Sequence, residues 1–176
     1  MVKINIKDKT FKVYINSTAI EKRIEDIATQ INSDYKDKSP IFLGVLNGSF
    51  MFASDLYKKI TITSEISFVK LASYSGTETT GEVKKLIGLN ESLKGKDIII
   101  IEDIVDTGIT IEKLVNELNN LEVSSIKIAT LLLKPESYKK NIKIDYFCFE
   151  IPNNFVVGYG LDYDGLGRNF PDIYSL

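Results

Sequence analysis

The spacing of apolar residues along the chain predicts helices and strands in alternation. Isoleucines recur three or four positions apart in the first predicted helix, over residues 17–35, and line one of its faces: Ile20, Ile24, Ile27 and Ile31. Ser17 is placed to cap the start of this helix. Similar but shorter patterns predict two more helices, over residues 49–59 and 110–120.

Short continuous apolar runs predict strands that are buried on both faces. The clearest is DIIIIED at residues 97–103, where acids bound four isoleucines. Comparable runs predict the other strands, over residues 40–46, 65–71, 125–133 and 144–149. After Ile151 the chain is rich in glycine, aspartate and aromatic residues, and we expect loops with one short strand. This alternation is typical of a mostly parallel sheet flanked by helices.

Residues 73–82 interrupt the pattern. They include no large aliphatic residue and many small or turn-favouring ones, which predicts a loop, and a strand over 84–88 would close it into a hairpin. The chain has no repeats and no proline-, serine- or glycine-rich linker. Because 176 residues suit one domain, we predict a single α/β domain over residues 1–176.

Composition narrows the classes of function. The net charge of −2 gives no reason to expect a nucleic acid or a membrane surface as partner, and no apolar run approaches the roughly 20 residues of a membrane span. The first ten residues carry scattered charges, unlike a secretory signal. With Cys148 as the one cysteine and no histidine, an internal disulfide, a Ser-His-Asp triad and a Cys- or His-rich zinc site are excluded. We expect a cytoplasmic protein with carboxylate, lysine or tyrosine chemistry, and Mg²⁺ if it uses a metal.

The segment IIIIEDIVDTGIT, residues 98–110, carries the sharpest functional pattern. A buried strand delivers Glu102 and Asp103 to its carboxyl end, where ligands bind in open α/β sheets. The small residues of Asp106-Thr107-Gly108 then open a helix, whose free N–H groups suit an anion. Acids beside an anion site suit a phosphorylated sugar. The alternative is that Asp106 only caps the helix and the two acids are solvated.

As a string, this segment closely resembles the phosphoribosyl pyrophosphate signature of type I phosphoribosyltransferases. No GxGxxG fingerprint and no P-loop occurs in the chain. The resemblance extends from about residue 40 to about residue 170 and narrows to the hypoxanthine-guanine phosphoribosyltransferase branch. Four further segments carry it: VLNGSFMFASDL (45–56), SYSGTETTGEVK (73–84), LLLKPE (131–136) and EIPNNFVVGYGLDYDGLGRNFPDI (150–173).

The resemblance implies a parallel-sheet domain with a small hood from the terminal segments. It also implies a reaction in which a 6-oxopurine displaces pyrophosphate from phosphoribosyl pyrophosphate with Mg²⁺. Asp106 would be the general base, and Glu102 and Asp103 would lie near the ribose hydroxyls. The 5′-phosphate would be held by the loop that follows: Thr107, Gly108, Ile109 and Thr110.

The other segments contribute by the same resemblance to the purine, pyrophosphate and metal sites. The pyrophosphate would contact Asn47 and Gly48, in a loop with a cis peptide, and also Arg168. Asp162 would bind Mg²⁺ directly or through water. The purine would be bound by three residues. Lys134 would donate to its exocyclic oxygen, Phe155 would stack on its ring, and Val156 would bind its edge through the backbone.

Each of these residues has a structural alternative. Lys134 at a strand end can be merely exposed, Phe155 can be a core aromatic, and Arg168 can form a surface ion pair. Ser73 and Tyr74 mark a loop that would close over the reaction centre and exclude water, or a hairpin without a role. The chain departs from residues common in the family at four positions: Asn47, Ile109, Leu133 and Asn154.

Two rival functions remain open from the sequence. One is a relative that prefers another base, such as xanthine or a pyrimidine. The other is a non-catalytic regulator that senses phosphoribosyl pyrophosphate and binds nucleic acid, which would need a basic surface that the charge balance does not indicate. The family resemblance suggests a homodimer or homotetramer.

Overall fold

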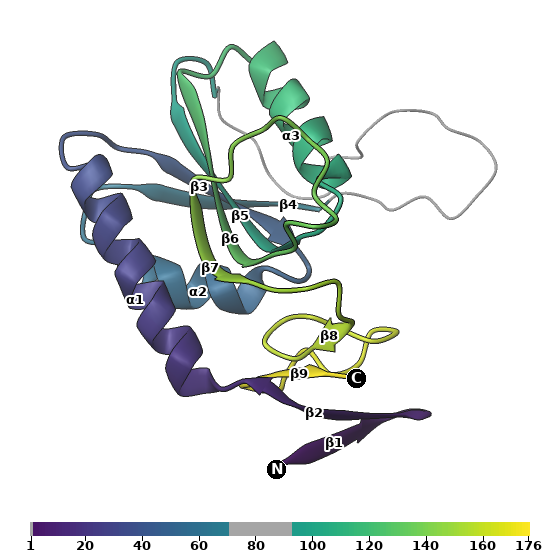
Figure 1. Ribbon diagram of the computed structural model, residues 1–176. Coiled ribbons are helices and arrows are strands. Elements are labelled where there is room, and N and C mark those ends of the chain that lie inside the picture. The colour runs from purple at the N-terminus through teal and green to yellow at the C-terminus, as the bar shows by residue number, and fades with distance from the viewer. Residues whose placement is uncertain (1, 71–92) are drawn as a thin grey trace.

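The computed structural model describes residues 2–70 and 93–176, and its centre is a parallel five-stranded sheet (Figure 1). The strand order is β4-β3-β5-β6-β7. The bounds are Ile41–Leu46 for β3, Glu65–Lys70 for β4, Asp97–Val105 for β5, Ser125–Leu133 for β6 and Tyr146–Glu150 for β7. This confirms the predicted parallel sheet. The predicted loop 73–82 and strand 84–88 lie outside the described residues.

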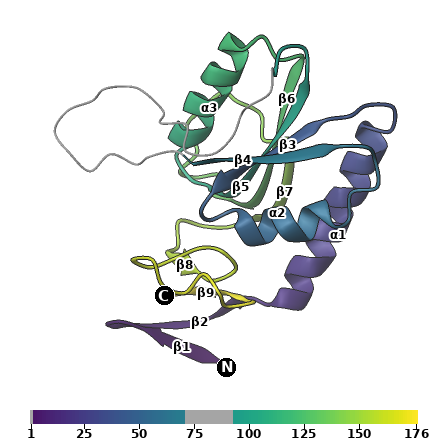
Figure 2. The ribbon, with the colours of Figure 1, turned by 180° about the vertical axis from the view of Figure 1, so that it is seen from behind.

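Helices cover both faces of this sheet (Figures 1 and 2). The helices α1 (Ser17–Asp34) and α2 (Phe50–Tyr57) lie on one face, and α3 (Ile109–Asn120) lies on the other. Successive side chains of a strand point to opposite faces. The isoleucines of β5 therefore divide between two cores, one shared with α1 and α2 and one shared with α3: Ile99 and Ile101 in the first, Ile98 and Ile100 in the second.

A second, antiparallel sheet joins the two ends of the chain. Its order is β1-β2-β9-β8. The bounds are Lys3–Ile6 for β1, Lys9–Ile15 for β2, Val156–Val157 for β8 and Ile173–Ser175 for β9. This is the hood expected from the terminal segments. The tail forms two short strands, β8 and β9, where one was predicted. They pair with each other, and β9 also pairs with β2.

One predicted helix cap is wrong, and one alternative for a second helix is excluded. The cap of α1 is Asn16, whose side chain accepts a hydrogen bond from the Ala19 N–H, so the prediction of Ser17 was wrong. The Ser17 N–H donates instead to Asp172 Oδ1 at 2.7 Å. The N-cap of α3 is Gly108, with φ of 82°, and therefore Asp106 does not cap this helix.

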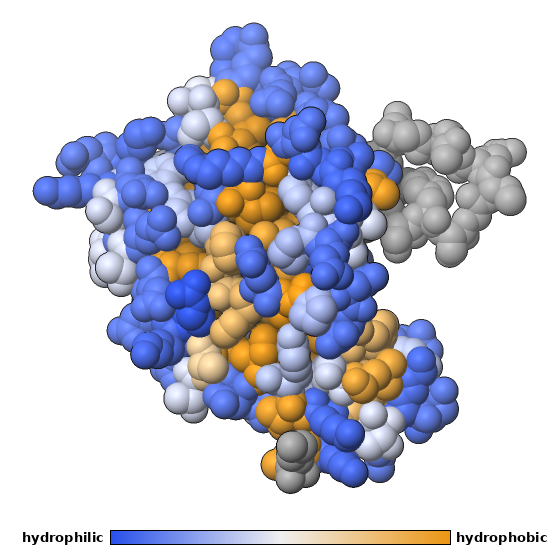
Figure 3. Space-filling view, viewed as in Figure 1, coloured by the Kyte–Doolittle hydropathy of each residue, from blue (hydrophilic) through white to orange (hydrophobic). Residues whose placement is uncertain are grey.

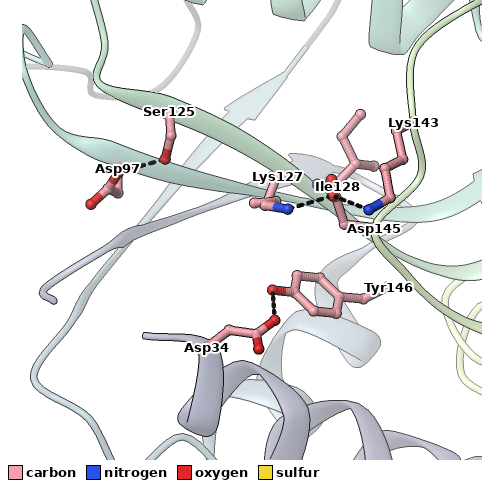
Figure 4. Close-up of polar contacts among 8 residues, drawn as sticks. All are labelled: Asp34, Asp97, Ser125, Lys127, Ile128, Lys143, Asp145 and Tyr146. Carbon is pink, nitrogen blue, oxygen red and sulfur yellow. Dashed lines mark hydrogen bonds and ion pairs between the residues drawn. The ribbon is translucent and has the colours of Figure 1, made fainter. Parts of the chain in front are cut away.

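Hydrogen bonds and ion pairs connect residues near the amino ends of the parallel strands (Figure 4). Ser125 donates to Asp97, and the carboxylate of Asp145 accepts from Lys127 at 2.8 Å and from the Ile128 N–H at 3.1 Å. Tyr146 donates to Asp34 at 2.7 Å, which ties β7 to the end of α1. The acids at this end are thus paired with neighbours of the same fold, and they offer no reason to look for the functional site here.

The surface agrees with an ordinary globular fold. On the face viewed in Figure 1, apolar residues gather along the middle of the molecule and hydrophilic residues surround them (Figure 3). Within the described part of the chain, no helix has the length and apolar character needed to cross a membrane.

Candidate active site

The predicted site residues of the described chain that end or follow β3, β5 and β6 lie at the carboxyl ends of the parallel strands, and the others lie on or beside the antiparallel sheet. The loop 47–49 follows β3, and the loop 106–108 joins β5 to α3. Lys134 follows β6 directly, and the segment 151–155 leads from β7 to β8. Because all five strands run in one direction, their carboxyl ends meet at one edge, where α/β sheets bind ligands. Ser73 and Tyr74 lie outside the described residues.

Glu102 and Asp103 form an acidic pair at the end of β5, in which Glu102 is buried and Asp103 is half-buried. Glu102 is 6% exposed, and burial raises its pKa well above the ordinary value, with a further rise from the neighbouring charge of Asp103. Its Oε1 accepts from the Asp103 N–H at 3.3 Å, whereas its Oε2 accepts no hydrogen bond from the described residues. Buried polar atoms in native proteins are nearly always paired, so this oxygen is suited to a ligand donor. The alternative of two solvated acids is therefore wrong for Glu102, whereas Asp103 keeps some exposure.

Asp103 packs against the loop that follows β3. A methyl group added at Gly48 would lie 1.6 Å from Asp103 Oδ2, so any side chain at this position would displace the Asp103 carboxylate. The peptide bond between Leu46 and Asn47 is cis, as the resemblance implied. Burial raises the pKa of Asp103, although its hydrogen bonds and the charge of Arg168 act in the opposite direction.

Asp106 and Lys134 form an ion pair across the ends of β5 and β6. The distance from Lys134 Nζ to Asp106 Oδ2 is 2.9 Å. The lysine side chain is 9% exposed and the aspartate 44% exposed, so the carboxylate is the more accessible partner. Lys134 also donates to Asn153 Oδ1 at 3.3 Å. Asn153 was not among the residues predicted from the sequence. Lys134 is therefore not the merely exposed residue of the alternative.

Asp162 and Arg168 are paired on the loop between β8 and β9. Arg168 Nη2 lies 2.6 Å from Asp162 Oδ1, and Arg168 Nη1 donates to the Gly160 carbonyl at 2.6 Å. The backbone of Gly160 lies against the Gly48 carbonyl, which brings this loop to the one that follows β3. Arg168 therefore does form an ion pair, as the structural alternative held, but this pair lies beside the loop 47–49 rather than on an open surface.

Phe155 is 46% exposed and is not a core residue. Its ring centroid is 6.2 Å from that of Phe11 and 5.8 Å from that of Tyr163, and Lys9 Nζ lies 5.8 Å from it. Next to it, Val156 is buried. The sequence did not indicate Phe11 and Lys9 as neighbours of Phe155, because no local pattern connects β2 with residue 155. Tyr163 was not indicated either.

The loop before α3 presents backbone rather than bulky side chains. Gly108 is buried with a positive φ, and an added methyl group would lie 2.4 Å from the Tyr138 ring. Ile109 is 51% exposed, at the first position of the helix. The first turn of any helix has N–H groups without intrahelical partners, and such groups can accept an anion.

Most of the chain resembles one known protein family. The model of the phosphoribosyl transferase domain matches residues 13–164, most of the chain. The chain belongs to the phosphoribosyl transferase family. Phosphoribosyl transfer is the transfer of a pentosyl group, so this phosphoribosyltransferase is an enzyme of the glycosyltransferase class. The family resemblance of the sequence is confirmed.

Relatives of known name and structure agree. The phosphoribosyltransferase is 44% identical over 163 residues to the hypoxanthine-guanine phosphoribosyltransferase of Bacillus subtilis, covering 92% of this chain and 91% of the relative. It is 42% identical over 161 residues to that of Streptococcus pyogenes, covering 91% and 89%. The crystal structure of a hypoxanthine phosphoribosyltransferase from Staphylococcus aureus matches with a TM-score of 0.86 at 42% identity, covering 94% of this chain and 90% of the other.

Proposed function

We propose that this phosphoribosyltransferase converts hypoxanthine and guanine, with phosphoribosyl pyrophosphate, to IMP and GMP and pyrophosphate. The observation that carries the proposal is the Asp106–Lys134 pair at the carboxyl edge of the sheet. A carboxylate acceptor next to an ammonium donor is complementary to the edge of a 6-oxopurine, where an N7–H donor lies beside the O6 acceptor. The named relatives, which are hypoxanthine-guanine phosphoribosyltransferases, support the same choice of base.

The purine would be bound by three residues in this proposal. Lys134 donates to O6, and an adenine is disfavoured because its exocyclic amine is a donor at the same place. Phe155 offers an exposed ring on which the base stacks, since its other contacts are to Phe11 and Tyr163. Val156 would meet the edge of the base through its backbone.

The ribose and its 5′-phosphate would occupy the end of β5 and the start of α3. The unpartnered Oε2 of Glu102 suits a ribose hydroxyl, which would satisfy it, and Asp103 lies beside it. Backbone N–H groups at Thr107, Gly108, Ile109 and Thr110 would hold the phosphate.

The pyrophosphate would lie between the loops of Gly48 and Arg168, with Asn47 at its edge. The guanidinium of Arg168 supplies a positive charge there, and it is only partly buried. Asp162 supplies carboxylate oxygens, the ligand type that Mg²⁺ prefers, and because Oδ1 pairs with Arg168 and Oδ2 accepts from the Gly165 N–H, it would hold the ion through water or after releasing one of these partners. A bound Mg²⁺ would supply positive charge next to the pyrophosphate.

The protein's own part in the reaction follows from these positions. The bond from the anomeric carbon to pyrophosphate breaks and the bond to purine N9 forms, through a state with oxocarbenium character. Negative charge on the Glu102–Asp103 pair would support the positive ring, as carboxylates do for glycosyl cations. Asp106 accepts the proton of N7 as general base, and Lys134 stabilises the negative charge that develops on O6.

Pyrophosphate release with Mg²⁺ and five separate bases tests the proposed function. We expect turnover with hypoxanthine and guanine, and little or none with xanthine, adenine or uracil. Lys134→Met should raise KM for hypoxanthine about tenfold or more, because it removes a charged donor to O6. Turnover chiefly with adenine or uracil would contradict the role of Lys134, whereas turnover with xanthine, which also carries O6, would change only the assignment at the 2-position. Tight binding of phosphoribosyl pyrophosphate without turnover of any base would favour the regulator.

Gly160→Ala is expected to weaken pyrophosphate binding by about tenfold or more. Gly160 has φ of 98°, and an added methyl group would lie 2.1 Å from the Gly48 carbonyl, so the two pyrophosphate loops must separate. Gly165→Ala is the matched control: φ is 82° there, but no atom lies within 4 Å of the new methyl group. Calorimetric titration with pyrophosphate and Mg²⁺ compares the two, and equal loss in both variants would contradict the steric argument.

We further propose that the enzyme is a cytoplasmic homodimer or homotetramer that acts on small molecules and uses neither nucleic acid nor membrane. The buried, unpaired Cys148 suits a reducing compartment. The near balance of 22 basic and 24 acidic residues gives no support for nucleic-acid binding. Sedimentation of the purified protein tests the assembly.

A further inference from the structure

A buried tyrosine connects the loop of Asp162 and Arg168 to α2. The hydroxyl of Tyr159 donates to Asp55 Oδ2 at 2.5 Å, and the tyrosine is 5% exposed. The other oxygen of Asp55 pairs with Lys58 at 2.6 Å. Burial acts to raise the pKa of Asp55, but the hydrogen bonds from Lys58 and Tyr159 outweigh it and lower the pKa. Asp55 is therefore an ionised acceptor, which makes a stronger hydrogen bond than a neutral one.

The backbone next to Tyr159 contacts both loops that are assigned to pyrophosphate, those of Gly48 and of Arg168. Tyr159 has φ of 49°, an uncommon value for a residue with a side chain, and its N–H donates to the Phe170 carbonyl at 2.8 Å. The next residue, Gly160, donates to the Arg168 carbonyl at 2.9 Å and accepts from the Arg168 side chain. The same glycine touches the Gly48 carbonyl.

The partner of Tyr159 belongs to the helix that follows the first of these loops. Asp55 lies on α2, which begins at Phe50, directly after the loop 47–49. The hydrogen bond therefore holds the helix after one pyrophosphate loop to the start of the other. Its ends are 104 positions apart in the chain, so it is a tertiary contact between the two halves of the site.

We propose that Tyr159 and Asp55 are positioning residues for pyrophosphate: their hydrogen bond sets the distance between the Gly48 loop and the Asp162–Arg168 pair. This inference rests on the proposed function, because it assigns pyrophosphate to those two loops. Neither side chain is among the residues assigned above to the substrates. They act through Gly160, whose backbone lies between Tyr159 and both loops.

Tyr159→Phe tests this by removing one hydroxyl. We expect KM for phosphoribosyl pyrophosphate, and for pyrophosphate in the reverse reaction, to rise roughly tenfold, the effect of one hydrogen bond to a charged group. KM for hypoxanthine should stay within about twofold, since Lys134 and Phe155 do not contact this bond. Tyr146→Phe is the matched control, because it removes a tyrosine-to-aspartate bond of 2.7 Å at the opposite end of the sheet.

The partner residue gives the second arm. Asp55→Ala should reproduce the effect of Tyr159→Phe, Asp55→Asn should restore part of it because the amide oxygen still accepts, and the double variant Tyr159→Phe/Asp55→Ala should be little worse than either. Additive effects in the double variant, or equal rises in all KM values for Tyr159→Phe and Tyr146→Phe, would overturn the proposal. If the wild type turns over no base, the proposed function fails, and calorimetric binding of pyrophosphate with Mg²⁺ to the same variants still decides this inference.

Discussion

Asp106→Asn is expected to lower kcat by about 10²–10⁴-fold, the usual contribution of a general base. The substitution keeps the size of the side chain and an oxygen that accepts from Lys134, which lies 2.9 Å away in the wild type. It removes the carboxylate that would take the proton of purine N7, and the chain has no histidine to replace it. KM for phosphoribosyl pyrophosphate should change by no more than a few-fold, because Asp106 does not contact the pyrophosphate loops in this proposal.

A matched variant separates this chemical role from the loss of an ion pair. Asp26 on α1 pairs with Arg23 at the same 2.9 Å, and its side chain is 51% exposed against 44% for Asp106. Asp26→Asn should leave kcat and both KM values unchanged. Steady-state rates of IMP formation across pH 6–9 make the comparison. A kcat for Asp106→Asn within threefold of wild type would exclude Asp106 as the base.

Glu102→Gln is expected to stabilise the free protein at pH 8 by about 1–3 kcal/mol while lowering kcat/KM for phosphoribosyl pyrophosphate roughly tenfold or more. Burial and the charge of Asp103 raise the pKa of Glu102 above its ordinary value of 4.5. The folded wild type therefore binds a proton more tightly than the unfolded chain, and its stability falls as the pH rises from about 4.5 through the folded pKa. Glutamine resembles the protonated acid and has no charge to bury at any pH.

The expected sign can be measured by urea unfolding at pH 4, 6 and 8. The gain in free energy of unfolding should be largest at pH 8 and should shrink towards pH 4, where the wild-type carboxyl is protonated in both states. Glu25→Gln on the exposed surface of α1 is the control, and its effect on stability should be small at every pH. If Glu102→Gln proves less stable than wild type at pH 8, the unpartnered carboxylate is not a source of destabilisation, and its assignment to the ribose loses its main support.

Local patterns in the sequence were enough for most of the fold. The isoleucine spacing predicted α1 to within one residue of its end at Asp34, and the run at 125–133 coincides with β6. Such predictions succeed because helix and strand periodicity depend on neighbours within a few positions. The N-terminal strands β1 and β2 were missed, since they are stabilised by pairing with each other and with β9 at the far end of the chain.

The same division holds for the site. The motifs around Glu102, Asp106 and Arg168 identified the family from the sequence alone, because the loops that bind phosphates and sugars need particular residues at fixed spacing. Only the tertiary structure decided which of these residues meet: Lys134 with Asp106, 28 positions apart, and Tyr159 with Asp55, 104 apart. Pairing at such separations depends on how strands and helices pack, and the burial that leaves one oxygen of Glu102 without a partner arises only once that packing is complete.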